Sequence, residues 1–334
     1  MGSHLAIDLL DASQVGEARR AVARLSQSLG FDEETSGRAA LVATELGTNL
    51  VRHAHGGRLM LAARHDLPTG GGVEMLSVDE GPGMADLAAC RRDGYSSGGT
   101  PGTGLGAIER MSDEFSITST PGRGTIAVAR VFAQRRAVAS GSFRAAGLST
   151  CAPGETVCGD AYALRINGAS ASVVVADGLG HGPGAAEASL AAVKVFDTAA
   201  DGASPAQILE RSHAALRVTR GAAAAVAQLD AARGTVVFAG AGNIAGRIIS
   251  GVDDRSLLSQ HGTVGLQIRR IQEASYEWPA HALVVLHSDG VASRWTLADT
   301  PGLLQSDPLV IAAWLLREHS RGRDDATVVV IRRS

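Results

Sequence analysis

Residues 45–53 read Glu-Leu-Gly-Thr-Asn-Leu-Val-Arg-His, and they begin the set of motifs that together indicate the fold of the first half of the chain. This stretch lies in a helix predicted over residues 32–54, so Glu45, Asn49 and His53 recur every four residues and form one polar stripe. A carboxylate beside an amide oxygen can hold Mg²⁺ and orient an attacking hydroxyl group. The apolar positions that recur at helical spacing are Leu41, Val42, Leu46 and Leu50. Alone, such a stripe is typical of a solvated helix face, and the role of His53 is left open.

Two glycine-rich motifs follow the polar stripe. Asp-Glu-Gly-Pro-Gly-Met, residues 79–84, comes at the end of a predicted strand. The Asp79 carboxylate can accept a hydrogen bond from an adenine amino group, while glycines let the base approach the backbone. Gly-Thr-Gly-Leu-Gly-Ala, residues 102–107, opens a predicted helix whose first N–H groups suit phosphate oxygens. Each motif is weak alone, but together they indicate a nucleotide site.

In this order and spacing, the motifs resemble the N, G1 and G2 boxes of the GHKL ATPase and kinase superfamily. Gly-Arg-Gly-Thr at 122–125 matches its terminal Gly-x-Gly-Thr, and the resemblance covers about residues 5–132. Residues 93–96 and 110–115 are most similar to RsbT-type switch kinases. Those kinases phosphorylate a serine or threonine on STAS-domain proteins of bacterial stress-signalling complexes. The resemblance implies a Bergerat-type α/β sandwich that binds ATP with Mg²⁺.

The same resemblance implies roles for individual residues. Asn49 would ligate Mg²⁺, Glu45 would act as the base, and Asp79 would bind adenine. The other nucleotide-binding positions would be Gly81, Gly83, Gly102, Gly104, Gly106 and Thr125.

Four aspartates in the second half stand at the ends of strand-like runs: Asp160, Asp177, Asp289 and Asp324. Carboxylates at strand ends on one sheet edge converge, and an all-oxygen site suits Mg²⁺ or Mn²⁺. Two such ions can bridge a water, lower its pKa and present it to a phosphoryl group. A single Asp-Gly pair is most often a turn, but four after valine-rich strands indicate a metal centre.

This set resembles the SpoIIE-type branch of metal-dependent protein serine/threonine phosphatases over residues 142–334, in a short RsbX-like form. The resemblance implies an α-β-β-α sandwich with two Mn²⁺ or Mg²⁺ ions. Asp160 and Asp177, with the Gly178 carbonyl, would hold one metal, and Asp177, Asp289 and Asp324 the other.

Some positions near these aspartates depart from the family pattern or carry no assigned role. Cys158 and Ala163 stand at the two ends of the fuller Gly-Gly-Asp-Phe-Tyr-Asp pattern. Asp325 occupies a position where relatives carry Asn, so it would at most support the metal ligands from behind, and its role is otherwise left open. His181 and His287 are expected to be loop and core residues.

Composition and net charge exclude some classes of function. The 334 residues are 45% hydrophobic and 19% charged, which allows two ordinary cores. Because the net charge is only −3 and both signs are interspersed, we expect neither nucleic acid nor an anionic membrane as a partner. Lys194 is the sole lysine, so a Walker-type phosphate lysine is excluded.

The cysteine pattern and the apolar runs bear on location. Cys90, Cys151 and Cys158 are odd in number and lack CxxC spacing, which predicts a reducing compartment, without a disulfide framework or a zinc site. No run reaches about 18 consecutive apolar residues. The initial Met-Gly-Ser-His is typical of an expression remnant, so we expect a cytoplasmic protein.

We therefore predict a tag remnant at 1–4, a GHKL kinase domain at 5–132, a linker at 133–141 and a phosphatase domain at 142–334. The kinase domain would phosphorylate STAS-domain partners, and the phosphatase domain would dephosphorylate them. A downstream regulator or a sigma-factor pathway protein would be a further class of partner. A sensor histidine kinase is disfavoured, because too little chain precedes Glu45 for a phosphoacceptor helix. The alternative is an anti-sigma-factor-type binding protein whose grip on its partner is controlled by ATP, with the phosphatase acting on an antagonist.

Overall fold

The computed structural model describes residues 4–65, 71–90, 104–134, 142–268 and 270–333. The chain divides into two compact units, Met1–Ala139 with Gln305–Val310, and Ser140–Leu304 with Ile311–Ser334. Most of the predicted linker, 135–141, and most of the predicted tag remnant, 1–3, lie outside the described residues. The predicted domain bounds therefore stay predictions.

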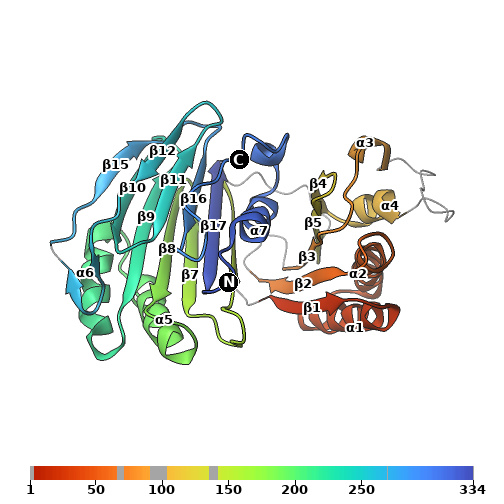
Figure 1. Cartoon of the computed structure of the whole chain (residues 1–334), viewed down its shortest axis with the longest axis horizontal. Coiled ribbons are helices and arrows are strands. Elements are labelled where there is room, and N and C mark those ends of the chain that lie inside the picture. Colours follow the sequence, from red (N-terminus) through yellow and green to blue (C-terminus); the bar gives the residue numbers. More distant parts are fainter. Residues whose placement is uncertain (1–3, 66–70, 91–103, 135–141, 269, 334) are drawn as a thin grey trace. The chain divides into compact units, whose positions relative to one another are not determined.

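The first unit is built on one antiparallel sheet of five strands, in the order β1-β2-β3-β5-β4. Helices α1 and α2 lie together on one face of this sheet (Figure 1). The strands are β1 (Leu5–Leu9), β2 (Gly57–Arg64), β3 (Gly72–Val78), β4 (Glu114–Thr120) and β5 (Gly124–Phe132). The helices are α1 (Ala12–Ser28), α2 (Glu33–His53), α3 (Leu87–Cys90) and α4 (Gly104–Met111).

Helix α2 has a buried apolar face and a more exposed polar face, which carries Glu45 and Asn49. Val42, Leu46 and Leu50 are buried in the core beneath the sheet, as the sequence predicts. Leu41, which we also expected on the apolar face, is 40% exposed. The reason is geometric, because position 41 lies four residues before Glu45 and therefore falls on the polar stripe.

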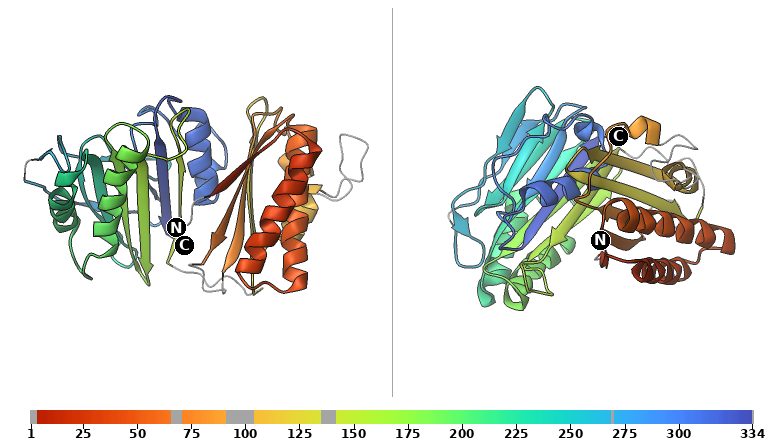
Figure 2. Two further views of the ribbon diagram at one scale, coloured as in Figure 1. Left: turned by 90° about the horizontal axis from the view of Figure 1, so that it is seen from below. Right: turned by 45° about the vertical axis from the view of Figure 1, so that its right-hand side comes forward.

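The second unit contains two five-stranded antiparallel sheets. Their strand orders are β15-β10-β9-β8-β7 and β12-β11-β16-β17-β6. Helices α5 (Pro183–Asp197) and α6 (Pro205–Ala215) cover the outer face of the first sheet, and α7 (Pro308–His319) lies beside the outer face of the second (Figures 1 and 2). This arrangement is the predicted α-β-β-α order.

The strands of the second unit have the following bounds. The first sheet contains β7 (Asp160–Asn167), β8 (Ser170–Gly178), β9 (Ala222–Asp230), β10 (Thr235–Ala241) and β15 (Ala274–Glu277). The second contains β6 (Phe143–Thr150), β11 (Ala245–Ile249), β12 (Asp254–Leu257), β16 (Leu283–His287) and β17 (Ala326–Arg333). The pair β13 (Gly262–Thr263) and β14 (Gln267–Ile268) forms a separate small ribbon.

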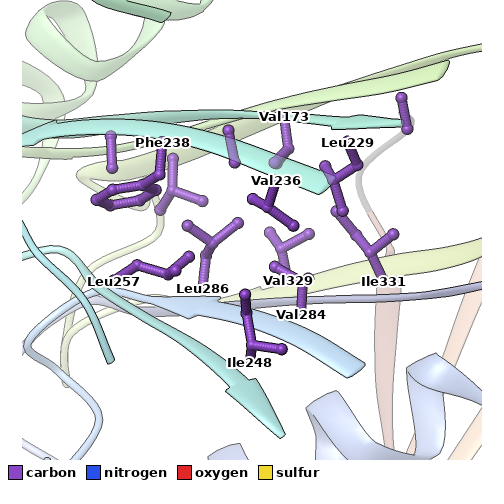
Figure 3. Close-up of a cluster of buried hydrophobic side chains, with 14 of the residues drawn as sticks. Val173, Leu229, Val236, Phe238, Ile248, Leu257, Val284, Leu286, Val329 and Ile331 are labelled. Atoms are coloured by element: carbon purple, nitrogen blue, oxygen red, sulfur yellow. The ribbon is translucent and has the colours of Figure 1, made fainter. Parts of the chain in front are cut away.

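Alternation along the strands forms a core on each face of the first sheet. In β8, Val173 and Val175 point toward the facing sheet, whereas Val174 and Ala176 contact the layer under α5 and α6. Figure 3 shows how side chains from both sheets meet in the layer between them, with Val236 and Phe238 on one side and Leu286 on the other. Strands buried on both faces read as continuous apolar runs, which explains their valine and alanine richness.

The helix predicted over residues 32–54 is confirmed as α2, and the strand predicted before Asp79 is confirmed as β3. Asp-Arg-Ser-Leu in β12 carries no apolar alternation, so only pairing with β11 makes it a strand. Helix α6 ends at Ala215 and continues as one 3₁₀ turn, Leu216–Val218.

Candidate functional site

The first and third motifs meet in the first unit. Glu45 and Asn49 are half-buried on α2, and α4 begins at Gly104. A Cβ atom at Gly104 would lie 3.3 Å from Oε2 of Glu45 and 3.6 Å from Oδ1 of Asn49. A carboxylate, an amide oxygen and the backbone of a helix start therefore stand together. This donor set fits a magnesium nucleotide.

The second motif meets the fourth at Asp79, directly after β3. Oδ1 of Asp79 accepts hydrogen bonds from the backbone N–H groups of Gly81, at 2.9 Å, and Thr125, at 3.0 Å. Gly124 has φ +81°, and a Cβ atom there would overlap the Asp79 carbonyl oxygen. Glycine is therefore required where the two loops touch, because a side chain would drive them apart.

The other predicted nucleotide residues are placed as follows. Gly83 lies in the loop after β3, where a Cβ atom would overlap the Thr120 carbonyl oxygen, and Gly106 is buried in α4. Gly102 and the segment 93–96 lie outside the described residues. His53 is exposed at the end of α2.

The four aspartates of the second unit come from both sheets, not from one sheet edge as we expected. Asp160 begins β7 and faces Asp177 near the end of β8 in the antiparallel register. Asp289 follows β16, and Asp324 precedes β17 in the other sheet. Antiparallel neighbours place the start of one strand beside the end of the next, so each sheet supplies one such pair.

Three hydrogen bonds hold these aspartates in place. Ser288 Oγ donates to Asp160 Oδ2 at 2.6 Å, which links the two sheets. The N–H of Thr327 donates to Ser288 Oγ at 2.9 Å, and Asn243 Nδ2 donates to Asp289 Oδ2 at 2.6 Å. Sequence reasoning missed Ser288 and Asn243. Ser288 could have been suspected beside Asp289, but Asn243 carries no sequence signal, because only the fold brings its turn there.

Electrostatics show that the carboxylates converge. Burial, followed by the charges of Asp160, Asp289 and Asp324, raises the pKa of Asp177. Burial, helped by Asp325 and Asp324, also raises the pKa of Asp160, although its hydrogen bond from Ser288 opposes the shift. Oδ1 of Asp160 is buried and has no hydrogen-bond partner among the described residues. A crowded set of acidic oxygens with an unsatisfied member fits divalent cations.

Gly178, predicted to offer its carbonyl, ends β8 directly after Asp177 and is buried. A Cβ atom there would overlap the Ala185 carbonyl oxygen, so α5 packs against the bare backbone.

The two histidines lie as expected. His287 is 2% exposed; its Nδ1 is 2.8 Å from the Ser288 carbonyl oxygen, and its Nε2 accepts from Trp295. Burial lowers the pKa of His287, so it stays a neutral core residue. His181 is exposed in a loop, with Nδ1 2.6 Å from Oε1 of Glu155.

Comparisons with protein families cover both units. Residues 9–130 match the family model "Histidine kinase-like ATPase domain", and residues 167–334 match "Stage II sporulation protein E (SpoIIE)". These matches confirm the two resemblances read from the motifs and the fold classes that they imply. No helix in the described part of the chain is both long and apolar enough to cross a membrane.

The chain is also similar to individual proteins. The chain is 30% identical over 118 residues to "Serine/threonine-protein kinase RsbT" of Bacillus subtilis (strain 168), covering 35% of this chain and 84% of that protein. A solved structure described as "The bacterial stressosome: a modular system that has been adapted to control secondary messenger signaling" is 27% identical, with a TM-score of 0.52. That likeness covers 57% of this chain and 99% of the other. RsbX in complex with magnesium is 19% identical with a TM-score of 0.48, covering 57% of this chain and 96% of RsbX.

Proposed function

Because the chain belongs to the SpoIIE family over residues 167–334 and, over 118 residues, to the family of the serine/threonine-protein kinase RsbT, we propose that it is a partner-switching regulator of STAS-domain proteins. It is a serine/threonine kinase and a metal-dependent serine/threonine phosphatase in one chain. The kinase would phosphorylate a serine or threonine of the partner, and the phosphatase would remove that phosphate. The observation that supports the proposal most is that candidate residues of each predicted site lie together in the fold.

In the kinase, the chain's own residues would bind and orient the reactants. Asn49 would hold the magnesium of ATP, and Asp79, fixed by Gly81 and Thr125, would accept from adenine. Glu45 would orient the partner's hydroxyl group and take its proton, a task that matters in the transition state rather than in nucleotide binding. The nearness of Gly104 to Glu45 and Asn49 supports this division of roles.

In the phosphatase, Asp160 and Asp177 with the Gly178 carbonyl would hold one Mn²⁺ or Mg²⁺, and Asp177, Asp289 and Asp324 the other. When bound, such ions supply an acidified water as the nucleophile for phosphoester hydrolysis. Ser288 and Asn243 would fix the orientation of Asp160 and Asp289, respectively. The unsatisfied Oδ1 of Asp160 supports the assignment.

The partner class rests on the relatives. RsbT is a serine/threonine kinase, and the structure with 27% identity to this chain belongs to work on the bacterial stressosome. Both support a STAS-type partner, since the motif resemblance points to kinases of that substrate class.

The test is a time course of phosphate incorporation from labelled ATP into a purified STAS-domain protein, with Mg²⁺ and with or without Mn²⁺. We expect label on serine or threonine, an unchanged initial rate and a higher plateau for Asp177→Asn, and no transfer for Glu45→Gln although it still binds ATP. Glu80→Gln, an exposed neighbour of Asp79, is the matched control and should behave as wild type.

Two outcomes would contradict the proposal. Label that never reaches the STAS protein, together with ATP-controlled capture of a sigma factor, would favour the anti-sigma-factor reading. Equal plateaus in wild type and Asp177→Asn, with no phosphate released from isolated phosphorylated partner, would show that the second unit acts on another substrate.

A further inference from the structure

Two of the three cysteines come together at the ends of one loop. Cys151 follows β6 directly, and Cys158 stands two residues before β7. In the register between β6 and β17, Thr150 pairs with Ala326, so the next residue, Cys151, lies beside Asp325. The Sγ atoms of both cysteines and a carboxylate oxygen of Asp325 all lie within 4.8 Å of one another. The spacing in sequence gave no sign of this grouping.

Asp325 is the buried member of the group. It is 3% exposed, and its Oδ1 accepts a hydrogen bond from the N–H of Ala152 at 2.8 Å. Its Oδ2 is buried and has no hydrogen-bond partner among the residues that the structure describes. A carboxylate oxygen buried without a partner is costly, so this atom points to a missing ligand.

We propose that Cys151, Cys158 and Asp325 form a binding site for a thiophilic divalent cation of the zinc class. Two thiolates and a carboxylate are three of the four ligands that such an ion takes, and water can supply the fourth. Soft sulfur ligands separate this site from the aspartate set, whose oxygens suit Mg²⁺ and Mn²⁺. The inference does not depend on the proposed function.

A disulfide between the two cysteines accounts for less of the geometry. It would use both sulfur atoms but give the Asp325 carboxylate no partner, whereas a cation engages all three groups. A bound cation would also fix both ends of the loop between β6 and β7. Because β7 begins at Asp160, the site would steady the strand that carries this aspartate.

The test uses the full, reduced protein in excess Mg²⁺, which occupies oxygen-ligand sites. Zn²⁺ is titrated in competition with a chromogenic zinc indicator, and we expect one tightly bound equivalent. Cys151→Ser and Cys158→Ala should each weaken this binding more than about tenfold. Cys90→Ser, which alters the third thiol in α3 of the other unit, is the matched control and should bind as wild type.

A second measurement identifies the ligands. Co²⁺ in place of Zn²⁺ should give a thiolate-to-cobalt charge-transfer band that Cys90→Ser keeps and Cys151→Ser loses. Since Cys151 is exposed, its serine variant should fold, and circular dichroism checks this. Equal zinc affinity in wild type and Cys151→Ser would overturn the proposal. So would zinc binding that Asp177→Asn abolishes and the cysteine variants leave intact.

Discussion

The buried carboxylates of the two units are held in opposite ways. In the first unit, Glu74 is 2% exposed but paired with Arg130 at 2.6 Å and Arg64 at 3.0 Å, and Asp79 accepts two backbone hydrogen bonds. In the second unit, Asp160 and Asp325 each keep a buried oxygen that has no partner among the described residues.

The two units therefore differ in where their buried acids find partners. In the first unit, arginines pair with Glu74 and backbone N–H groups fix Asp79, so both of these acids have their partners within the protein. The acids of the second unit face one another, and burial, together with repulsion from neighbouring carboxylates, raises the pKa of Asp160 and of Asp177. Cations must therefore supply there what arginine supplies in the first unit.

The largest expected effect comes from breaking the aspartate set. Asp177→Asn should lower phosphatase turnover with Mn²⁺ more than about a hundredfold, because it removes the carboxylate assigned to both metals. The same change should raise the thermal midpoint of the metal-free protein by about 2–4 °C, because it relieves repulsion with Asp160 and Asp289. Turnover is measured on a phosphorylated partner and the midpoint by calorimetry. A lower midpoint in the metal-free variant would contradict the account of repulsion.

The next prediction concerns the stability of the first unit, at the contact between Gly124 and Asp79. Gly124→Ala should lower the free energy of unfolding by about 2–5 kcal/mol, because it combines left-handed strain with overlap on the Asp79 carbonyl. Gly122→Ala is the matched control in the same turn, with φ +73° and no atom within 4 Å of the added Cβ. Gly122→Ala should lower the free energy of unfolding only by the strain of a left-handed backbone, about 1–2 kcal/mol. Denaturant unfolding that gave equal losses would show that contact with Asp79 is unimportant.

The paired acid of the first unit predicts a pH dependence. Burial alone would raise the pKa of Glu74, but the Arg130 guanidinium, with His4 and Arg64, lowers it well below its ordinary 4.5. A carboxylate with a lowered pKa stabilises the fold above its ordinary pKa, and this contribution is lost as the pH falls. Glu74→Gln should therefore cost about 2–3 kcal/mol at pH 7, and progressively less as the pH falls below 4.5.

Unfolding of wild type and Glu74→Gln across this pH range checks the prediction. Asp8→Asn is the control, since Asp8 and Arg58 form an exposed ion pair in the same unit. An exposed pair contributes little, so Asp8→Asn should change stability by less than about 1 kcal/mol at every pH. If the difference in free energy of unfolding between wild type and Glu74→Gln stayed constant with pH, the ion pair would be ruled out as the source of that difference.

The smallest expected effect concerns a positioning residue of the aspartate set. Asn243→Ala should weaken Mn²⁺ binding about tenfold, because Asp289 loses the amide that orients it at 2.6 Å. Calorimetric titration measures the affinity, and Asn243→Gln, which keeps an amide, should restore part of it. Unchanged Mn²⁺ affinity in Asn243→Ala would mean that Asp289 is positioned by other groups or does not bind the metal.

Local patterns predicted much of this molecule. The four-residue spacing of Glu45 and Asn49 placed both on one helix face, and the helix predicted over 32–54 is observed as α2, Glu33–His53. These features depend on neighbours along the chain, where helix and strand periodicity is reliable. Leu41 was wrongly predicted to lie on the buried face of the helix. Its side chain is as apolar as those of the buried stripe beside it, so residue type alone does not distinguish them. The site roles of the aspartates and of Glu45 and Asn49 stay predictions.

The motifs along the chain were enough to predict the two folds, their order and the residue types offered at each candidate site. Contacts between distant segments, in contrast, became visible only in the folded chain. Ser288 donates a hydrogen bond to Asp160 because the two sheets face each other. Asn243 donates one to Asp289 from a turn whose sequence contains no recognisable motif. Cys151 meets Asp325 through the register of β6 and β17. Strand pairing joins residues far apart in sequence, and its register is set by the packing of whole sheets, which no local spacing records.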